Sequence, residues 1–189
     1  MPFRRGFKSQ CERRSVEFRK QFGLAQDAAL PANRLAEELD VRVWSVHDVR
    51  GVSANAIKVS VDEGDPSWSA FTMRIGPHHL IVYKPVSSLG RTNNVIMHEL
   101  GHIILGHELA TACIFDDGSL VPGNFDQEQE NEADWLAGTL LLPRPALISI
   151  RRRRLGDQAA CREYLVSQEM LKWRFRMTGV DHQLSRRRA

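Results

Sequence analysis

The feature that most constrains this chain is the pentapeptide His98-Glu99-Leu100-Gly101-His102, which lies within a strongly apolar stretch. If the stretch is helical, the two histidines stand at i and i+4 and point from one face. Two imidazoles at this spacing can share one zinc ion, and Glu99 then lies where it can take a proton from bound water. The alternative is a pair of hydrogen-bonded core histidines with a glutamate on the surface. The apolar flanks disfavour that alternative, because two ionisable rings in such a helix need a partner.

The size and composition of the chain fit a globular protein. Its 189 residues suffice for one domain, or one domain with a small appendage, and 42% of them are hydrophobic. No apolar run reaches the length of a membrane span, and the charged N-terminus is not a secretory signal. Cys11, Cys113 and Cys161 are widely spaced and odd in number, which predicts reduced thiols and a cytoplasmic protein.

The periodicity of the chain predicts an α+β fold. Alternating residues indicate strands at 41–46, 68–75 and 80–83, with a turn at 76–79, and residues 111–127 read as a loop because they contain Gly118, Pro122, Gly123 and Asn124. Helices are expected at 7–22, 32–39, from Ser88 or Asn93 to His107, 128–142, 145–155, 157–166 and 168–177, the last capped by Ser167. This order predicts a short antiparallel or mixed sheet, with the HExxH helix and a second, glutamate-bearing helix beside it.

Catalytic zinc takes three protein ligands, so a third must come from elsewhere in the chain. Residues 108–134 carry eight acids and no Lys or Arg, and the candidates are Glu128, Glu130, Glu132 and Asp134. Glu130 shares a helix face with the small residues Ala133 and Ala137, so this face can approach the first helix closely. We therefore predict Glu130 as the third ligand, with Glu132 as the second choice, and Asp134 as a hydrogen-bond partner of His98 or His102.

The residues that would complete a hydrolytic site are less well defined by the sequence. Glu99 is expected to take a proton from water and pass it to the leaving amine. A further donor to the developing oxyanion is usual, and His107, His78, His79 and Tyr83 are the candidates, although each also fits a structural or exposed position. Two histidines and a carboxylate accept zinc and also manganese.

The positive charge of the chain is concentrated at its C-terminal end. Residues 151–189 contain eleven Lys or Arg against four acids, a net charge of +7. Such a segment favours solubility or an acidic partner, and direct nucleic-acid binding through it is the less favoured interpretation. We expect residues 1–150 to form a zincin-like peptidase domain and residues 151–189 to form a basic helical extension packed on it.

Two motifs together resemble the ImmA/IrrE family of metallo-endopeptidases. They are Arg91-x-x-Asn94-x-x-x-His98-Glu99-Leu100-Gly101-His102 and Glu130-x-Glu132-Ala133-Asp134-x-x-Ala137-x-x-Leu140-Leu141-Leu142-Pro143. The N-terminal segment RRGFKSQCERRS and the C-terminal segment SQEMLKWRFRMTGVD also resemble segments of proteins in this family. The family's third ligand falls on Glu130, and this chain has Asp134 where members often have Asn.

The resemblance implies a cytoplasmic bacterial or phage-encoded zinc protease. Known members cleave helix-turn-helix repressors, which switches on mobile-element or stress genes. We therefore expect a specific protein substrate, either such a repressor or an antitoxin-like partner, and no association with membranes. The rival interpretation is a non-catalytic regulatory module that is stabilised by metal and binds DNA or protein. A purely structural site has no use for a glutamate between its two histidines, so Glu99 favours the enzyme.

Overall fold

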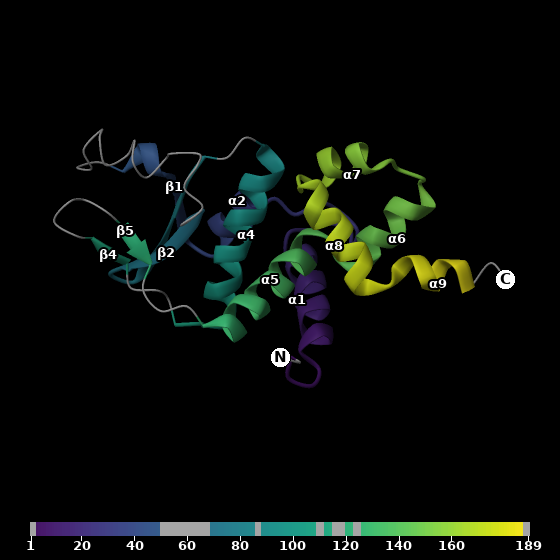
Figure 1. Ribbon diagram of the computed structural model, residues 1–189, viewed down its shortest axis with the longest axis horizontal. Helices are drawn as coiled ribbons and strands as arrows, with labels where there is room; N and C mark the ends of the chain where they lie inside the picture. Colours follow the sequence, from purple (N-terminus) through teal and green to yellow (C-terminus); the bar gives the residue numbers. More distant parts are fainter. Residues whose placement is uncertain are drawn as a thin grey trace.

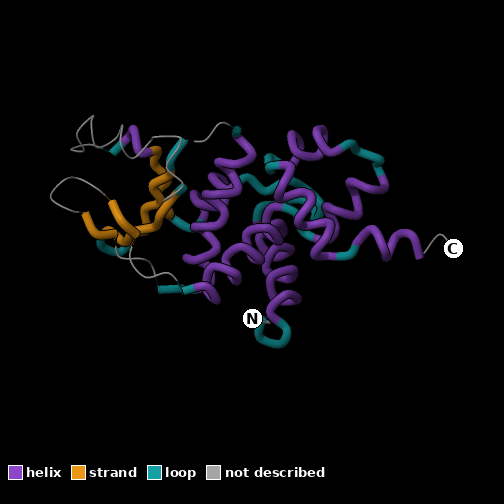
Figure 2. The backbone as a smooth tube through the Cα atoms, in the orientation of Figure 1, coloured by secondary structure: helices purple, strands orange, loops and turns teal. Residues whose placement is uncertain are grey.

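The computed structural model describes residues 3–49, 69–85, 88–108, 112–114, 120–122 and 126–186. Figure 1 shows the strands at one end of the molecule, a group of helices in the middle that includes two crossing helices, and the helices of the C-terminal part at the other end. Figure 2 shows the same division by element type, with all strands gathered on one side. The α+β class expected from the sequence is therefore confirmed.

The three-stranded sheet is mixed. Its order is β1-β3-β2, and the central strand β3 runs parallel to β1 and antiparallel to β2. The first elements along the chain are α1 (Phe7–Gln21), α2 (Ala32–Glu38), β1 (Val41–Ser45), the short 3₁₀ helix η1 (Val46–Asp48), β2 (Ala70–Ile75) and β3 (His78–Tyr83). His78 and His79 belong to β3, so the predicted turn at 76–79 is wrong at its last two positions. Gly76 makes the turn with a φ of 60°, and Trp68 lies outside the described residues.

Each face of the sheet contributes to a different apolar cluster. Ile81 of β3 enters the main core together with Met97 and Leu100 of the next helix. Its neighbours Leu80 and Val82 point the other way and pack with other residues in a small second cluster. Thr72 of β2 stands directly opposite Ile81 in the antiparallel register, so it faces the helical side of the sheet.

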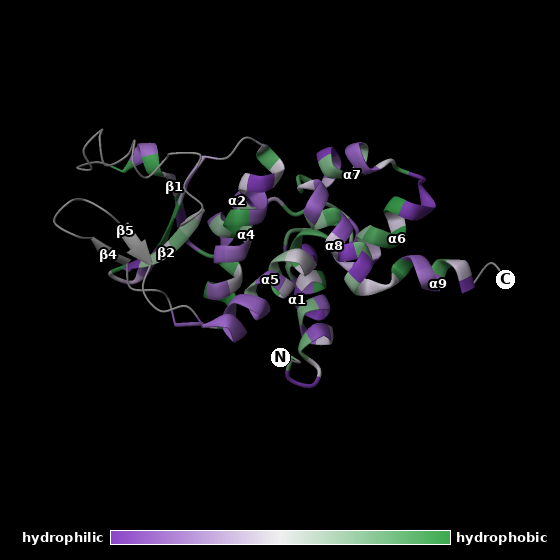
Figure 3. Cartoon of the chain, viewed as in Figure 1, coloured by the Kyte–Doolittle hydropathy of each residue, from purple (hydrophilic) through white to green (hydrophobic). Residues whose placement is uncertain are grey.

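Helices α4 (Leu89–Leu105) and α5 (Gln127–Leu141) cross at the centre of the molecule (Figure 1). Gly101 of α4 allows their backbones to meet, because a Cβ at this position would stand 3.1 Å from the carbonyl oxygen of Ala133 and 3.3 Å from its Cα. Figure 3 shows that α5 is hydrophilic where it begins and becomes more apolar toward its C-terminal end. The polar beginning of α5 therefore lies against α4, while its C-terminal half is buried in the core.

Buried side chains from distant helices satisfy the free carbonyl groups at the C-terminal end of α5. Ser15 donates to the carbonyl oxygen of Thr139, and Arg19 donates to that of Leu140. Arg174 donates to the carbonyl oxygen of Leu142. Both arginines are fully buried, and their positive charge complements the negative end of the helix dipole.

The C-terminal part of the chain is helical. It consists of α6 (Arg144–Arg152), α7 (Asp157–Tyr164), α8 (Gln168–Thr178) and α9 (Val180–Arg186). Helix α8 packs on α5, where a Cβ at Gly138 would lie 2.5 Å from the Trp173 ring. Ser167 caps α8 by accepting from the backbone N–H of Met170, as the sequence predicts. Helix α9 was not predicted, and Arg187 and Arg188 of the basic tail lie outside the described residues.

The segment between α4 and α5 is not wholly a loop, which corrects the sequence-based expectation. Strands β4 (Ala112–Ile114) and β5 (Leu120–Pro122) pair antiparallel within it. Gly118, Gly123 and Asn124 lie outside the described residues. Among the helices that the structure describes, none is long and apolar enough to cross a membrane.

Candidate metal centre

Helix α4 presents both histidines toward α5. The helix begins after Ser88, whose hydroxyl accepts a hydrogen bond from the backbone N–H of Arg91. His98 and His102 are four residues apart, so their rings lie on one face, 4.8 Å apart between centroids. Gly101 lies next to His102 and permits the close crossing with α5. The apolar pattern of α4 therefore buries one side of the helix and directs the imidazoles into the crossing.

Helix α5 supplies the carboxylate that faces the two rings. Asp126 caps this helix by accepting from the backbone N–H of Glu128, and Glu130 lies in its first turn. One oxygen of Glu130 lies 3.1 Å from Nε2 of His98, and the other lies 3.5 Å from Nε2 of His102. The three residues that the sequence predicts as metal ligands are thus brought together.

The arrangement of donor atoms fits a metal ion. The two Nε2 atoms are 3.1 Å apart, and the potential ligand atoms of His98, His102 and Glu130 all lie within 4.8 Å of one another. Two imidazoles and one carboxylate form a donor set that is found at catalytic zinc. The three side chains are 23%, 12% and 30% exposed, so solvent reaches the site. A partly open site of this kind leaves a position for water, whereas a structural zinc site is closed by four protein ligands.

Asp134 fixes the ring of His98. Its Oδ1 lies 2.9 Å from Nδ1 of His98, and because a carboxylate only accepts, Nδ1 carries the proton. Nε2 is then the nitrogen that faces Glu130 and His102. Burial alone lowers the pKa of His98, but the hydrogen bonds to Asp134 and Glu130 outweigh it and raise the pKa to about 10. The two carboxylates therefore favour a positive charge on His98.

Glu99 lies beside the convergent donors and accepts a hydrogen bond from a residue of the sheet. Thr72 of β2 donates its hydroxyl to Oε2 of Glu99 over 2.6 Å. Burial raises the pKa of Glu99, while the Thr72 hydrogen bond and the charge of His98 oppose the rise. A carboxylate with a raised pKa holds a proton more readily than an exposed glutamate, which suits a general base.

Thr72 is the contact that the sequence did not reveal. The residue falls within the predicted strand, but nothing in its local pattern indicates a partner 27 positions away. Only the pairing of β2 with β3 turns Thr72 toward α4. Its side chain is almost completely buried, so the hydroxyl needs an acceptor, and Glu99 provides it.

The remaining candidates occupy other positions around the site. Glu132 does not join the convergent donors and instead lies 3.3 Å from Nε2 of His107. His107 contacts His102 from the side of Nδ1, away from Nε2. His78 pairs with Asp40 at 2.8 Å in an exposed position. His79 and Tyr83 belong to β3, and the structure gives neither of them a contact with the donor cluster among the described residues.

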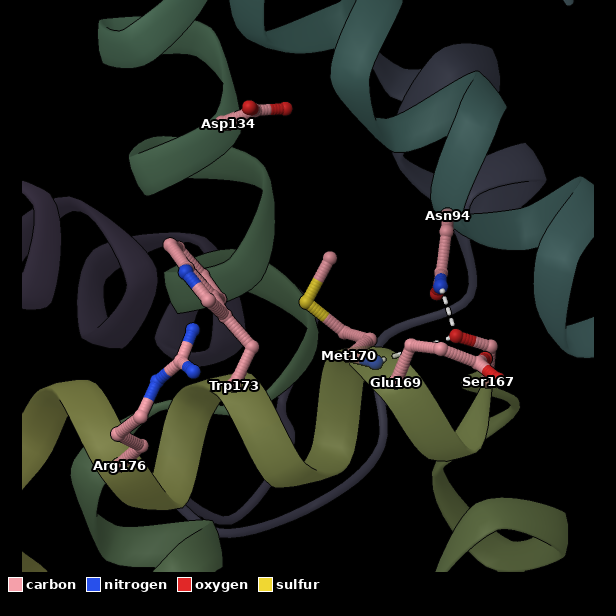
Figure 4. A pocket seen from close by; sticks show the side chains of 7 residues that line it. All are labelled: Asn94, Asp134, Ser167, Glu169, Met170, Trp173 and Arg176. Atoms are coloured by element: carbon pink, nitrogen blue, oxygen red, sulfur yellow. Dashed lines mark hydrogen bonds between the residues drawn. The ribbon is translucent and has the colours of Figure 1, made fainter.

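A cavity of about 420 Å³ adjoins this site, between α4, α5 and α8. Figure 4 shows Met170 and Trp173 projecting from α8, Asn94 pointing from α4 to Ser167, and Asp134 on α5 directed toward α4. Asn94 donates to the hydroxyl of Ser167, which ties α4 to the beginning of α8. Because Asp134 also contacts His98, the cavity and the donor cluster share a wall.

The α+β fold and the solvent-accessible His-His-Glu cluster together define a chain that could hold a metal ion beside the partly buried carboxylate of Glu99. The sequence model of a peptidase family, described as the IrrE N-terminal-like domain, matches residues 54–176. The match covers more than half of the chain, and the chain belongs to this family. The resemblance to ImmA/IrrE proteins is thereby confirmed. No curated protein matches the chain.

Proposed function

We propose that this protein is a zinc-dependent endopeptidase of the HExxH type. His98, His102 and Glu130 hold the ion in this proposal, and Glu99 is the catalytic base. The observation that carries the proposal is the convergence of the three ligand atoms within 4.8 Å, on a face that solvent reaches. Membership in a peptidase family supports peptide hydrolysis as the reaction.

The chemistry divides between the ion and the side chains around it. When bound, zinc acts as a Lewis acid toward water and toward the carbonyl group of the scissile bond. Asp134 orients His98 through Nδ1, so that the Nε2 lone pair is directed to the ion. Thr72 occupies Oε2 of Glu99, which leaves Oε1 to take a proton from the attacking water. Glu99 then passes this proton to the amine nitrogen of the departing peptide.

The substrate in this proposal is a helix-turn-helix repressor or an antitoxin-like partner, and its cleavage derepresses genes. Support comes from the family resemblance of the two motifs in α4 and α5. The shallow cavity beside Asp134 offers room for a side chain of a bound peptide. The donor set also accepts manganese, so elemental analysis has to decide between the metals.

The location of the protein and its division into parts belong to the same proposal. We place the protein in the cytoplasm, which suits the free thiols of Cys11 and Cys161. We propose that residues 1–150 form the peptidase domain and that residues 151–189 form a helical extension on it. The contact of Gly138 with Trp173 and the buried Arg174 support this packing.

A metal-stabilised module that only binds DNA or protein is the rival. It gives no reason for the hydrogen bond between Thr72 and the partly buried carboxylate of Glu99. Two arginines of the basic extension are already engaged, since Arg151 pairs with Asp181 and Arg153 pairs with Glu163. Salt-sensitive binding of DNA by the protein alone would support the rival.

The experiment that separates the two candidates compares the wild type with Glu99→Gln. Both zinc-loaded proteins are incubated with a soluble extract of the source cells, and new peptide N-termini are identified by labelling and mass spectrometry. We expect discrete new termini from the wild type and none from Glu99→Gln, although both proteins hold the same amount of zinc. Identical sets of termini from the two proteins would contradict the proposal.

A further inference from the structure

His107 occupies a position that the end of α4 dictates. Gly106 has a φ of 70°, a left-handed conformation that ends the helix. The backbone N–H of His107 donates to the carbonyl oxygen of His102, and that of Gly106 donates to Ile103. These two bonds form a Schellman motif, in which the residue after the glycine folds back on the residue five positions earlier. His107 is thereby placed against His102.

An imidazole contact replaces the apolar contact that usually accompanies this motif. Nδ1 of His107 lies 3.1 Å from Nδ1 of His102, and the ring centroids are 5.1 Å apart. Nε2 of His107 lies 3.3 Å from Oε2 of Glu132 on α5. The side chains of His107 and Glu132 are only 8% and 19% exposed, so water competes weakly for these bonds. Nε of the exposed Arg4 lies 3.8 Å from Oε1 of Glu132.

The chemistry of the three groups fixes the direction of their hydrogen bonds. A carboxylate only accepts, so Nε2 of His107 carries the proton that is donated to Glu132. Neutral His107 then has its lone pair on Nδ1, which can only accept. Nδ1 of His102 must therefore donate, and the lone pair of neutral His102 is on Nε2, the atom that faces His98 and Glu130.

We infer that His107 and Glu132 are positioning residues, which hold His102 in the tautomer and ring orientation needed for metal binding. This inference rests on the proposed metal site. It gives His102 a fixed partner equivalent to the Asp134 partner of His98, reached through one additional imidazole. Partners of this kind, which orient metal ligands from behind, typically contribute about 10- to 100-fold in metal affinity.

A matched pair of substitutions at His107 tests the inference. His107→Leu removes the acceptor but restores the apolar contact that Schellman motifs favour, so the variant is expected to fold. In His107→Asn, Oδ1 can stand where Nδ1 stood, so the acceptor for His102 is kept. We expect zinc affinity, measured by competition with a chromogenic chelator, to fall about 10- to 100-fold in His107→Leu and much less in His107→Asn.

A second readout needs no metal. Nitrogen-detected NMR of the metal-free protein reports which ring nitrogen of His102 carries the proton. We expect Nδ1–H in the wild type and in His107→Asn, and a mixture of tautomers in His107→Leu. Glu132→Gln should also give a mixture, because an amide can donate to His107 and reverse its tautomer.

The outcomes separate this inference from the proposed function. If the wild type binds zinc and His107→Leu binds it equally well with an unchanged His102 tautomer, the inference fails and the metal site stands. Equal losses in His107→Leu and His107→Asn would assign His107 a packing role and overturn the inference. If the wild type binds no zinc, the proposed function fails, and the positioning of a metal ligand fails with it.

Discussion

The crossing of α4 over α5 sets the distance between the candidate ligands, and Gly101→Ala tests this directly. The new Cβ would lie 3.1 Å from the carbonyl oxygen of Ala133 and 3.3 Å from its Cα. Ordinary contacts begin at 3.4 Å, so the backbone of α5 has to move by a few tenths of an ångström. Glu130 lies on the same helix, one turn before this contact, and moves with it. Metal sites tolerate ligand displacements of only about 0.2 Å.

Two opposing terms decide the effect of Gly101→Ala on stability. Replacing glycine by alanine inside a helix gains about 1 kcal/mol, while overpacking costs about 1–3 kcal/mol. We expect the free energy of unfolding of the metal-free protein to fall by about 0–2 kcal/mol, as measured by urea denaturation. Zinc affinity should fall about tenfold, which corresponds to about 1.4 kcal/mol. The loss of zinc affinity is therefore of the same order as the loss of stability, and the two have to be measured separately.

Gly138→Ala is the matched control on the opposite side of α5. Its Cβ would lie 2.5 Å from the Trp173 ring and 2.9 Å from Cδ of Arg174, so it should cost about 2–3 kcal/mol of stability. Gly138 is two turns, or about 12 Å, from Glu130, and zinc affinity should stay within about threefold of the wild type. An unchanged zinc affinity in Gly101→Ala, or an equal loss in both variants, would show that this helix crossing does not set the distance between the ligands.

Three further predictions follow from single contacts. Thr72→Val should lower the free energy of unfolding by about 1.5–3 kcal/mol, since it removes a hydrogen bond from the buried Thr72 hydroxyl to the partly buried carboxylate of Glu99. Thr72→Ser keeps the hydroxyl and should lose less than about 1 kcal/mol in the same urea titration; equal losses would contradict the contact. Burial raises the pKa of the Cys11 thiol to about 12, from 9.0, so between these pH values the thiol ionises in the unfolded chain but keeps its proton in the folded one. The free energy of unfolding should fall by up to about 1.4 kcal/mol per pH unit over this range, and Cys11→Ala should fall less steeply. Parallel pH profiles of the two proteins would argue against the buried thiol. Arg174→Met should cost about 3–5 kcal/mol in thermal or urea unfolding, because it leaves a partly buried carboxylate and a helix-end carbonyl without their cation. Arg153→Gln breaks an exposed pair and should leave the stability nearly unchanged, so similar losses for the two variants would contradict the buried role of Arg174.

The donor cluster was largely predictable because helix geometry converts spacing into direction. The i, i+4 spacing places His98 and His102 together, and the small residues after Glu130 favour its face over that of Glu132. The expected close approach is present, because Ala133 meets Gly101 of α4. Another small residue of α5, Gly138, serves the contact with α8 instead. Local spacing indicates that a helix face carries small residues, and tertiary packing decides which neighbouring helix packs against that face.

Other features depend on contacts between distant segments. Thr72 reaches Glu99 only after β2 pairs with β3, and Arg19 and Arg174 reach the end of α5 from opposite ends of the chain. The β4–β5 pair was missed because Pro122 and neighbouring turn residues give a stronger local signal than three-residue strands. His107 was considered as an oxyanion donor, and the Schellman turn at Gly106 instead places it behind His102.

In the proposed function, His98, His102 and Glu130 hold one metal ion. Elemental analysis of the purified wild type beside Glu130→Ala tests it most directly, with the exposed Glu128→Ala as the control. We expect about one zinc per chain in the wild type and in Glu128→Ala, and a loss of zinc in Glu130→Ala. A wild type without metal, or a metal content that is indifferent to Glu130, would contradict it.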